Sequence, residues 1–111
     1  MVAKHNTPKI IASITLDKGI WIVISDIRWN GNSSGLRMSY LSGSQSTPQY
    51  PLYAYANTKT DNAMMTVNFC QKNFVVVTAT QKTNIYFWIG QTSGSDLGYS
   101  NHTMYAFKIG N

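Results

Sequence analysis

Apolar and polar residues alternate along this chain with a period of two, which is the pattern of β-strands. The clearest stretch is residues 74–94, FVVVTATQKTNIYFWIGQTSG, which predicts two strands joined by a polar turn. These strands are Phe74–Thr80, a nearly continuous apolar run, and Ile85–Ile89. In the second strand, Ile85, Phe87 and Ile89 point to one face, and Tyr86 and Trp88 point to the other. A sandwich covers one face of each sheet, so we expect another subunit to cover the second apolar face.

Six further strands are predicted by short apolar runs between turn signals. They are Ile10–Leu16, Ile20–Trp29, Leu36–Leu41, Leu52–Asn57, Ala63–Cys70 and Thr103–Ile109. Polar turns or loops are expected at 17–19, 30–35, 42–51, 58–62, 71–73, 81–84 and 91–102. No segment shows helical periodicity. The spacing predicts a single-domain antiparallel β-sandwich or jelly roll over residues 10–111. Residues 1–9 are polar and predict a linker or stalk end.

The longest predicted strand, Ile20–Trp29, has two different faces. One face alternates through Trp21, Val23, Ser25, Ile27 and Trp29. The other is apolar for half its length and then charged, at Asp26 and Arg28. This face therefore runs from a covered region out to solvent, and the two charges predict an ion pair on the strand face or at an interface.

Composition and charge limit the classes of function and partner that we expect for this chain. The chain has 111 residues, of which 43% are hydrophobic and only 12% charged, about half the usual charged share. Its net charge of +5 comes from scattered basic residues, which form no groove for phosphates, so no nucleic-acid partner is expected. An anionic cell-wall polymer suits the same charge. The start, MVAKHNTPK, lacks a signal-peptide core, and no apolar run approaches the length of a membrane span, so no membrane insertion is expected.

Catalytic and metal chemistry are not expected. The four carboxylates form no motif, and they belong to Asp17, Asp26, Asp61 and Asp96. His5, His102 and Cys70 lie too far apart in sequence for a recognisable zinc site, and nothing indicates a cofactor. Cys70, the only cysteine, is expected to be a small buried hydrophobe.

Aromatic residues near polar neighbours are the candidates for binding. Most aromatics belong to a core or an interface, but Trp29, Tyr50, Tyr53 and Tyr99 lie at predicted strand ends or in loops. A sugar ring has an apolar C–H face and a polar rim, so an aromatic plate beside amide or hydroxyl groups engages both. His102 lies in similar surroundings, where it either bonds sugar hydroxyls or caps its loop.

Three segments carry a resemblance to the receptor-binding heads of phages. Residues 12–29, ASITLDKGIWIVISDIRW, resemble their "strand, Leu-x-x-Gly, aromatic-x-Val" segment. Ser34-Gly35-Leu36-Arg37 is similar to their recurrent Gly-x-Arg. Residues 83–111 resemble their closing arrangement of an aromatic strand, Gln-x-Ser-Gly, a loop and a last strand ending in Lys/Arg-Ile. The resemblance covers about residues 10–111.

The resemblance implies a homotrimeric β-sandwich knob, distantly like complement heads and tumour-necrosis-factor-like jelly rolls. Such a head tips a tail fibre or baseplate of a phage or prophage of a Gram-positive bacterium, so it would be part of the virion and act at the bacterial cell surface. Family heads bind cell-wall saccharide near protomer contacts with a Trp, a His–Asp pair and an Arg. Residues 79–84 here contain neither His nor Asp, while Trp88, Gln91 and His102 fall in the corresponding late segments.

The leading hypothesis is therefore a non-enzymatic, trimeric receptor-binding head for cell-wall saccharide. The residues assigned to saccharide binding are Trp29, Tyr53, Trp88, Gln91, Tyr99 and His102. One alternative is a structural trimerisation or capping module of a fibre or virion, which has the same fold and no ligand. Another is an adhesive module, similar to complement heads, that binds protein.

Overall fold

The computed structural model describes residues 1–31, 35–60 and 68–111, with the backbone alone at 59 and 60. Every secondary-structure element in this part is a β-strand, which confirms the all-β class. The strands are β1 (Val2–Ala3), β2 (Lys9–Leu16), β3 (Gly19–Trp29), β4 (Gly35–Ser42), β5 (Leu52–Thr60), β6 (Phe69–Ala79), β7 (Thr83–Gln91) and β8 (Leu97–Gly110). The described residues include no helix of the length and apolarity that a membrane crossing requires.

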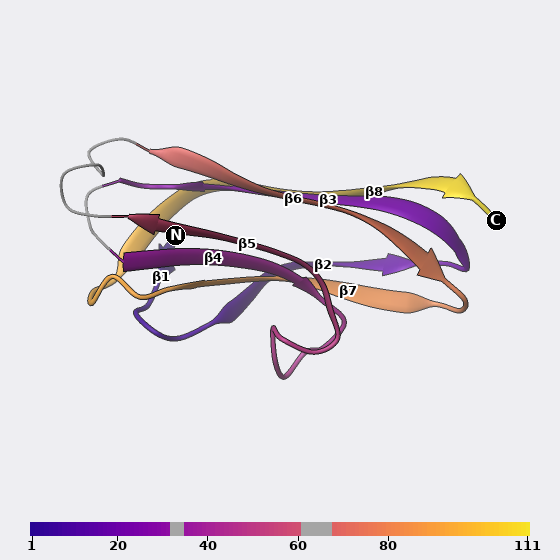
Figure 1. The fold of residues 1–111 in the computed structure, drawn as a ribbon, viewed down its shortest axis with the longest axis horizontal. Helices are drawn as coiled ribbons and strands as arrows, with labels where there is room; N and C mark the ends of the chain where they lie inside the picture. Colours follow the sequence, from indigo (N-terminus) through magenta and orange to yellow (C-terminus); the bar gives the residue numbers. More distant parts are fainter. Residues whose placement is uncertain (32–34, 61–67) are drawn as a thin grey trace.

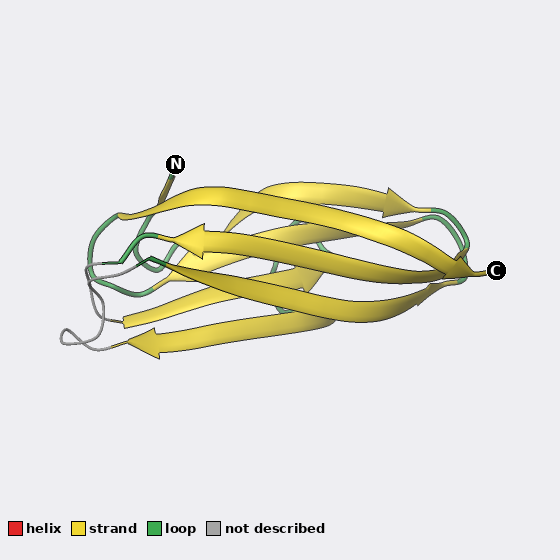
Figure 2. Cartoon of the chain, turned by 90° about the horizontal axis from the view of Figure 1, so that it is seen from above, coloured by secondary structure: helices red, strands yellow, loops and turns green. Residues whose placement is uncertain are grey.

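The strands form two four-stranded antiparallel sheets that pack face to face (Figure 1). Their orders are β1-β8-β3-β6 and β2-β7-β4-β5. Pairing is nested, because β1 pairs with β8, β2 with β7, β3 with β6 and β4 with β5. A long hairpin rolled onto itself has this pairing, which is the jelly-roll form of the β-sandwich. The molecule is elongated, 47 × 24 × 20 Å, with the chain ends toward opposite ends of the long axis (Figure 2).

The core lies where the inward faces of β3 and β7 meet. On β3, Val23 and Ile27 are fully buried, and on β7, Ile85, Phe87 and Ile89 are fully buried. Alternate residues of a strand point to opposite faces, so the period-two pattern predicts both sets. The alternation predicted from sequence is therefore seen in both strands.

Toward the end of β3 the interior becomes polar. The indole N–H of Trp29 donates to Oε1 of Gln71 across 3.0 Å. Nε2 of Gln71 donates to the carbonyl oxygen of Arg37 (2.8 Å) and to Oγ1 of Thr58 (3.0 Å). Arg37 is itself buried, with its guanidinium carbon 5.6 Å from the ring centroid of Phe69. Gln71 therefore joins both sheets through the interior and satisfies groups that burial removes from water.

Strand β6 differs from the sequence prediction. The sequence predicts a turn at 71–73, but the chain passes through these residues as one strand, Phe69–Ala79. Residues 63–67 of the predicted strand Ala63–Cys70 lie outside the described residues. Gln71 and Asn73 point inward, where Nδ2 of Asn73 donates to Oγ of Ser39 (2.9 Å). Cys70 points outward and is exposed, so the prediction of a buried thiol is wrong.

The first residues pack against the domain. Within residues 1–9, for which the sequence predicts a linker or stalk end, β1 pairs with the start of β8, and Ala3 is fully buried in the core. The backbone N–H of Asn6 donates to the carbonyl oxygen of Gln91 (2.7 Å), and Nζ of Lys9 donates to that of Val2 (2.7 Å). Strand β8 also begins at Leu97, earlier than predicted, because Leu97 and Gly98 pair with β1 and Tyr99 and His102 pair with β3.

We expect Gln71→Ala to lower the free energy of unfolding by about 2–4 kcal/mol, because the Trp29 indole N–H and the Arg37 carbonyl would lose a buried partner. Urea unfolding followed by tryptophan fluorescence, at fixed protein concentration, measures the change. The matched control is Gln81→Ala at an exposed turn position, with an expected change within about 0.5 kcal/mol. Equal midpoints for the two variants would contradict a structural role for the Gln71 side chain.

Candidate functional site

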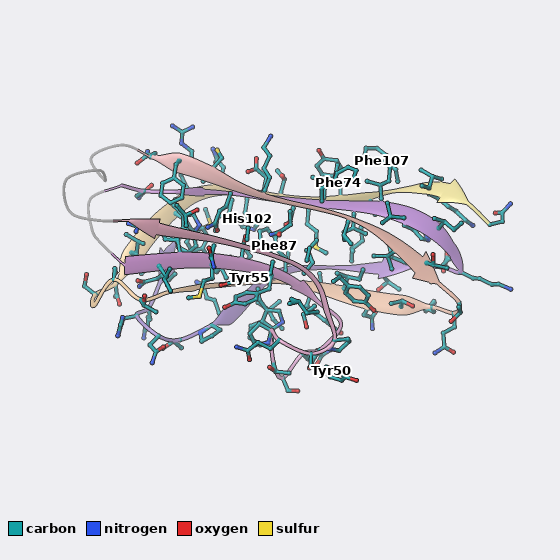
Figure 3. The ribbon with its side chains drawn as sticks, viewed as in Figure 1. Tyr50, Tyr55, Phe74, Phe87, His102 and Phe107 are labelled. Atoms are coloured by element: carbon teal, nitrogen blue, oxygen red, sulfur yellow. The ribbon has the colours of Figure 1, made fainter. Side chains whose placement is uncertain are left out.

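Three of the residues assigned to saccharide binding meet inside the sandwich. The ring centroids of Trp29 and Tyr99 are 6.0 Å apart, and those of Tyr99 and His102 are 6.1 Å apart. Figure 3 shows His102 between the two layers. Trp29 is 0% exposed and its N–H bonds Gln71, so its ring offers no surface to a sugar. His102 is half-buried, and its Nδ1 has no hydrogen-bond partner among the described residues.

Gln91 is a structural anchor in this fold. Its Nε2 donates to the carbonyl oxygens of Ala3 (2.9 Å) and Ser95 (2.7 Å), and its Oε1 accepts the backbone N–H of Ser93 (2.6 Å). The side chain is fully buried. It therefore ties the N-terminal strand to the β7–β8 loop, and its amide hydrogen bonds are used within the chain.

Trp88 lies on the outer face of the sheet β2-β7-β4-β5, beneath the β4–β5 loop. It is 7% exposed, and its indole N–H donates to the carbonyl oxygen of Ser44 (3.0 Å). Nε2 of Gln45 donates to the hydroxyl of Tyr86 (2.8 Å). The expectation that another subunit covers this face of β7 is thus corrected, because a loop of the same chain covers it. Tyr53 is half-buried and packs against the core.

An aromatic row crosses this outer face. Ile10, Trp88, Tyr40 and Tyr55 stand directly opposite one another on β2, β7, β4 and β5. The rings of Tyr40 and Tyr55 have centroids 5.0 Å apart, inclined by 37°. At the β5 edge, Tyr55 is 45% exposed, and its hydroxyl accepts Nδ2 of Asn57 (3.0 Å). We call Tyr40, Tyr55 and Asn57 the tyrosine site.

The tyrosine site offers an aromatic plate beside an exposed amide. Asn57 keeps its carbonyl oxygen on the exposed side chain, so a hydroxylated ligand stacked on Tyr55 finds an acceptor there. The hydroxyl of Tyr40 donates to Sδ of Met38 (3.2 Å). Burial raises the pKa of Tyr40, and the neighbouring Tyr55 raises it further. Tyr55 and Asn57 are not among the residues assigned from sequence, although their spacing of two places them on one face of a strand.

A second surface lies on the outer face of the other sheet, β1-β8-β3-β6. Its two rows of aligned residues across β8, β3 and β6 are Phe107, Ile22, Val76 and Tyr105, Ile24, Phe74. We call these six residues the apolar face. Phe74 is 65% exposed and Phe107 54%. Figure 3 shows both pointing away from the other sheet. The rings of Tyr105 and Phe107 meet edge to face, with centroids 5.4 Å apart.

The apolar face is comparable in size to the largest apolar patch of a typical monomer, and such patches are often functional. Its exposed area is roughly 500 Å², taking about 200 Å² for a large side chain, and a monomer's largest patch is about 300–600 Å². A polar border follows it directly: Thr103, Asp26 and Lys72 form the next row, and Arg28 pairs with Cys70 beyond them. An apolar centre with a polar rim is the usual anatomy of a protein interface.

Carboxylates and metal-binding groups are dispersed in the described residues. Asp17 lies in the β2–β3 turn, Asp26 on the outer face of β3 and Asp96 in the β7–β8 loop. Asp61 lies outside the described residues. In that part of the chain, no three His, Cys, Asp or Glu residues gather to hold a metal ion.

Comparison with protein-family models, with curated proteins and with solved structures finds no match for this chain.

The raised pKa of Tyr40 predicts a pH dependence of stability. The unfolded chain has the ordinary tyrosine pKa of 10.0 and releases its proton first, so the free energy of unfolding falls as pH rises above that value. We expect urea midpoints to fall as pH rises above about 10, and Tyr40→Phe to reduce this fall. Tyr50→Phe, at a loop position that is 78% exposed, is the control and leaves the fall unchanged. Identical curves for wild type and Tyr40→Phe would contradict the prediction.

Proposed function

We propose that this protein is a non-enzymatic receptor-binding head of a phage or prophage tail, which assembles as a homotrimer and recognises saccharide on the bacterial cell surface. The observation that carries the proposal is that the two outer faces of the sandwich have different chemistry. The apolar face suits contact with further copies, and the tyrosine site on the other sheet suits a hydroxylated ligand. The head would stand at the tail tip, joined to the rest of the fibre or baseplate.

The tyrosine site supports saccharide recognition through its chemistry. The exposed ring of Tyr55 matches the C–H face of a sugar, and the Asn57 amide matches its hydroxyl rim. Both residues lie on a strand, and Tyr40 packs under Tyr55 with its ring centroid 5.0 Å away. The plate is therefore held in place before a ligand arrives, which lowers the ordering cost of binding.

The apolar face supports assembly. Burying roughly 500 Å² of apolar surface stabilises a contact by about 12 kcal/mol before the costs of association, at about 25 cal/mol per Å². A chain of 111 residues without a described disulfide gains stability from such a contact. The positive net charge favours approach to an anionic cell-wall polymer.

A structural trimerisation or capping module is the second candidate. It is favoured by the placement of the residues assigned to saccharide binding: Trp29, Tyr99 and Gln91 are buried, and Trp88 lies under a loop. A module of this kind would use the apolar face and leave the tyrosine site without a ligand.

We expect Tyr55→Ala to weaken binding to host cell-wall polysaccharide at least about tenfold, because the stacking plate is lost. Isothermal titration with purified polysaccharide measures the affinity, with Tyr50→Ala as a control that removes an exposed tyrosine from the loop. The control retains wild-type affinity if the tyrosine site is correct. Equal losses in both variants would contradict the site, and wild-type protein that binds no polysaccharide would favour the structural module.

We expect light scattering to give three times the chain mass for wild-type protein, and Phe74→Lys to give the mass of one chain, because a buried lysine at the contact lacks a partner. The matched control is Leu52→Lys, an exposed leucine on β5 of the other sheet, which stays trimeric. A wild-type monomer, or a trimeric Phe74→Lys variant, would contradict assembly through the apolar face.

A further inference from the structure

A second pair of a tyrosine and an asparagine lies on the same outer face as the tyrosine site. Tyr86 and Asn84 alternate along β7 with residues of the buried core, so both point to the outer face of the sheet β2-β7-β4-β5. Asn84 is exposed and Tyr86 is half-buried. Their spacing of two residues repeats that of Tyr55 and Asn57 on β5. We call Tyr86 and Asn84 the second couple.

Hydrogen bonds at the surface hold the second couple in place. Nε2 of Gln45 donates to the hydroxyl oxygen of Tyr86 (2.8 Å), and Oγ1 of Thr15 donates to Oδ1 of Asn84 (2.7 Å). The hydroxyl proton of Tyr86 remains available to donate, and no described residue accepts a hydrogen bond from Nδ2 of Asn84. The second couple therefore presents a fixed ring beside donors, whereas the tyrosine site presents a ring beside the acceptor of Asn57.

The surroundings of the second couple are polar and uncharged. Its cross-strand partners and hydrogen-bonded neighbours are Ser13, Thr15, Ser42 and Gln45. These side chains offer hydroxyl and amide groups, which exchange hydrogen bonds with the hydroxyls of a sugar. They offer no cation to pair with a phosphate or carboxylate group. The chemistry at this position thus suits a neutral saccharide.

The distance between the two tyrosines sets the length of a shared ligand. Tyr55 stands opposite Tyr40, Tyr40 stands opposite Trp88, and Tyr86 comes two residues before Trp88. Two strand spacings of about 4.8 Å and two residue rises of about 3.4 Å place the Cα atoms of Tyr55 and Tyr86 roughly 12 Å apart. This distance exceeds the length of one sugar ring, so a ligand that contacts both rings contains several linked sugars.

We propose that Tyr86 and Asn84 form a second saccharide subsite, which together with the tyrosine site binds one uncharged stretch of several linked sugars. The ring of Tyr86 stacks on the C–H face of a sugar, and Nδ2 of Asn84 donates to its hydroxyl oxygens. The positive net charge acts at longer range, on the approach of the whole polymer. This inference rests on the saccharide recognition proposed above, and it adds the length and the charge of the bound stretch.

The test compares variants of the second couple by isothermal titration with the purified host cell-wall polysaccharide. We expect Tyr86→Ala to weaken binding at least about tenfold, and Tyr86→Phe to stay within about threefold of wild type because the ring remains. Asn84→Ala changes an exposed side chain, so it leaves the fold intact and weakens binding about fivefold. The matched control is Lys82→Ala, two residues before Asn84 in the β6–β7 turn, which keeps wild-type affinity because the bound stretch is uncharged.

Fragments of the same polysaccharide, made by partial hydrolysis and separated by size, test whether one ligand spans both positions. The shortest fragment whose binding is weakened by Tyr86→Ala should also be weakened by Tyr55→Ala, and should bind in a ratio of one fragment per copy. Circular dichroism checks that each variant is folded, and light scattering checks that its assembly equals that of the wild type.

The outcomes separate this inference from the function on which it rests. Wild-type protein that binds no polysaccharide overturns both. Binding that Tyr55→Ala weakens, and that Tyr86→Ala and Asn84→Ala leave unchanged, overturns the second subsite and leaves saccharide recognition intact. A loss in Lys82→Ala equal to that in Tyr86→Ala overturns the uncharged ligand, and two fragments per copy overturn the shared one. If Tyr86→Ala fails to fold, Asn84→Ala decides the result.

Discussion

The constraint on which this structure depends is that a two-layer sandwich covers only one face of each sheet. The inward faces of β3 and β7 cover each other. On the sheet β2-β7-β4-β5, the β4–β5 loop covers the outward Trp88. On the sheet β1-β8-β3-β6, the described residues leave Phe74 and Phe107 more than half exposed. The two outer surfaces therefore differ because only one of them is covered by its own chain.

Much of the fold follows from local pattern, and its errors have a physical cause. Alternation is enough to assign the faces of β3 and β7, because most of their inward residues are apolar or small. It fails at Gln71, Lys72 and Asn73, which look like a turn because all three are polar. Gln71 and Asn73 are buried by partners on β3, β4 and β5, which no local window contains. In this polar part of the interior, Gln71 and Asn73 are buried and their neighbour Cys70 is exposed. The prediction that Cys70 is buried is wrong for the same reason.

The residues of a binding surface are harder to predict from the sequence. A residue at the end of a predicted strand can still be buried once the strands are packed together. Trp29 ends β3, yet the start of β8 brings Tyr99 and His102 around it inside the sandwich. Gln91 likewise ends β7, yet it is buried. Its amide donates to the carbonyl oxygen of Ala3 on β1, which pairs with β8 in the other sheet. The pairing of β1 with β8 joins residues almost a hundred positions apart, so it cannot be inferred from spacing alone. By contrast, the exposure of Tyr55 on an edge strand follows once the order of the sheet is known.

The placement of the two surfaces has a consequence for affinity. The layers of a sandwich are about 10 Å apart, so residues on opposite outer faces share no contacts and their energetic effects are close to additive. In the proposed function, each copy would hold a ligand at Tyr55 and Asn57 with modest strength while the apolar face joins it to others. Several modest sites on one rigid assembly bind a repetitive polymer far more tightly than one site does, because the later contacts form at high effective concentration. In an assembly of this kind, the apolar face would contribute to recognition without touching the ligand.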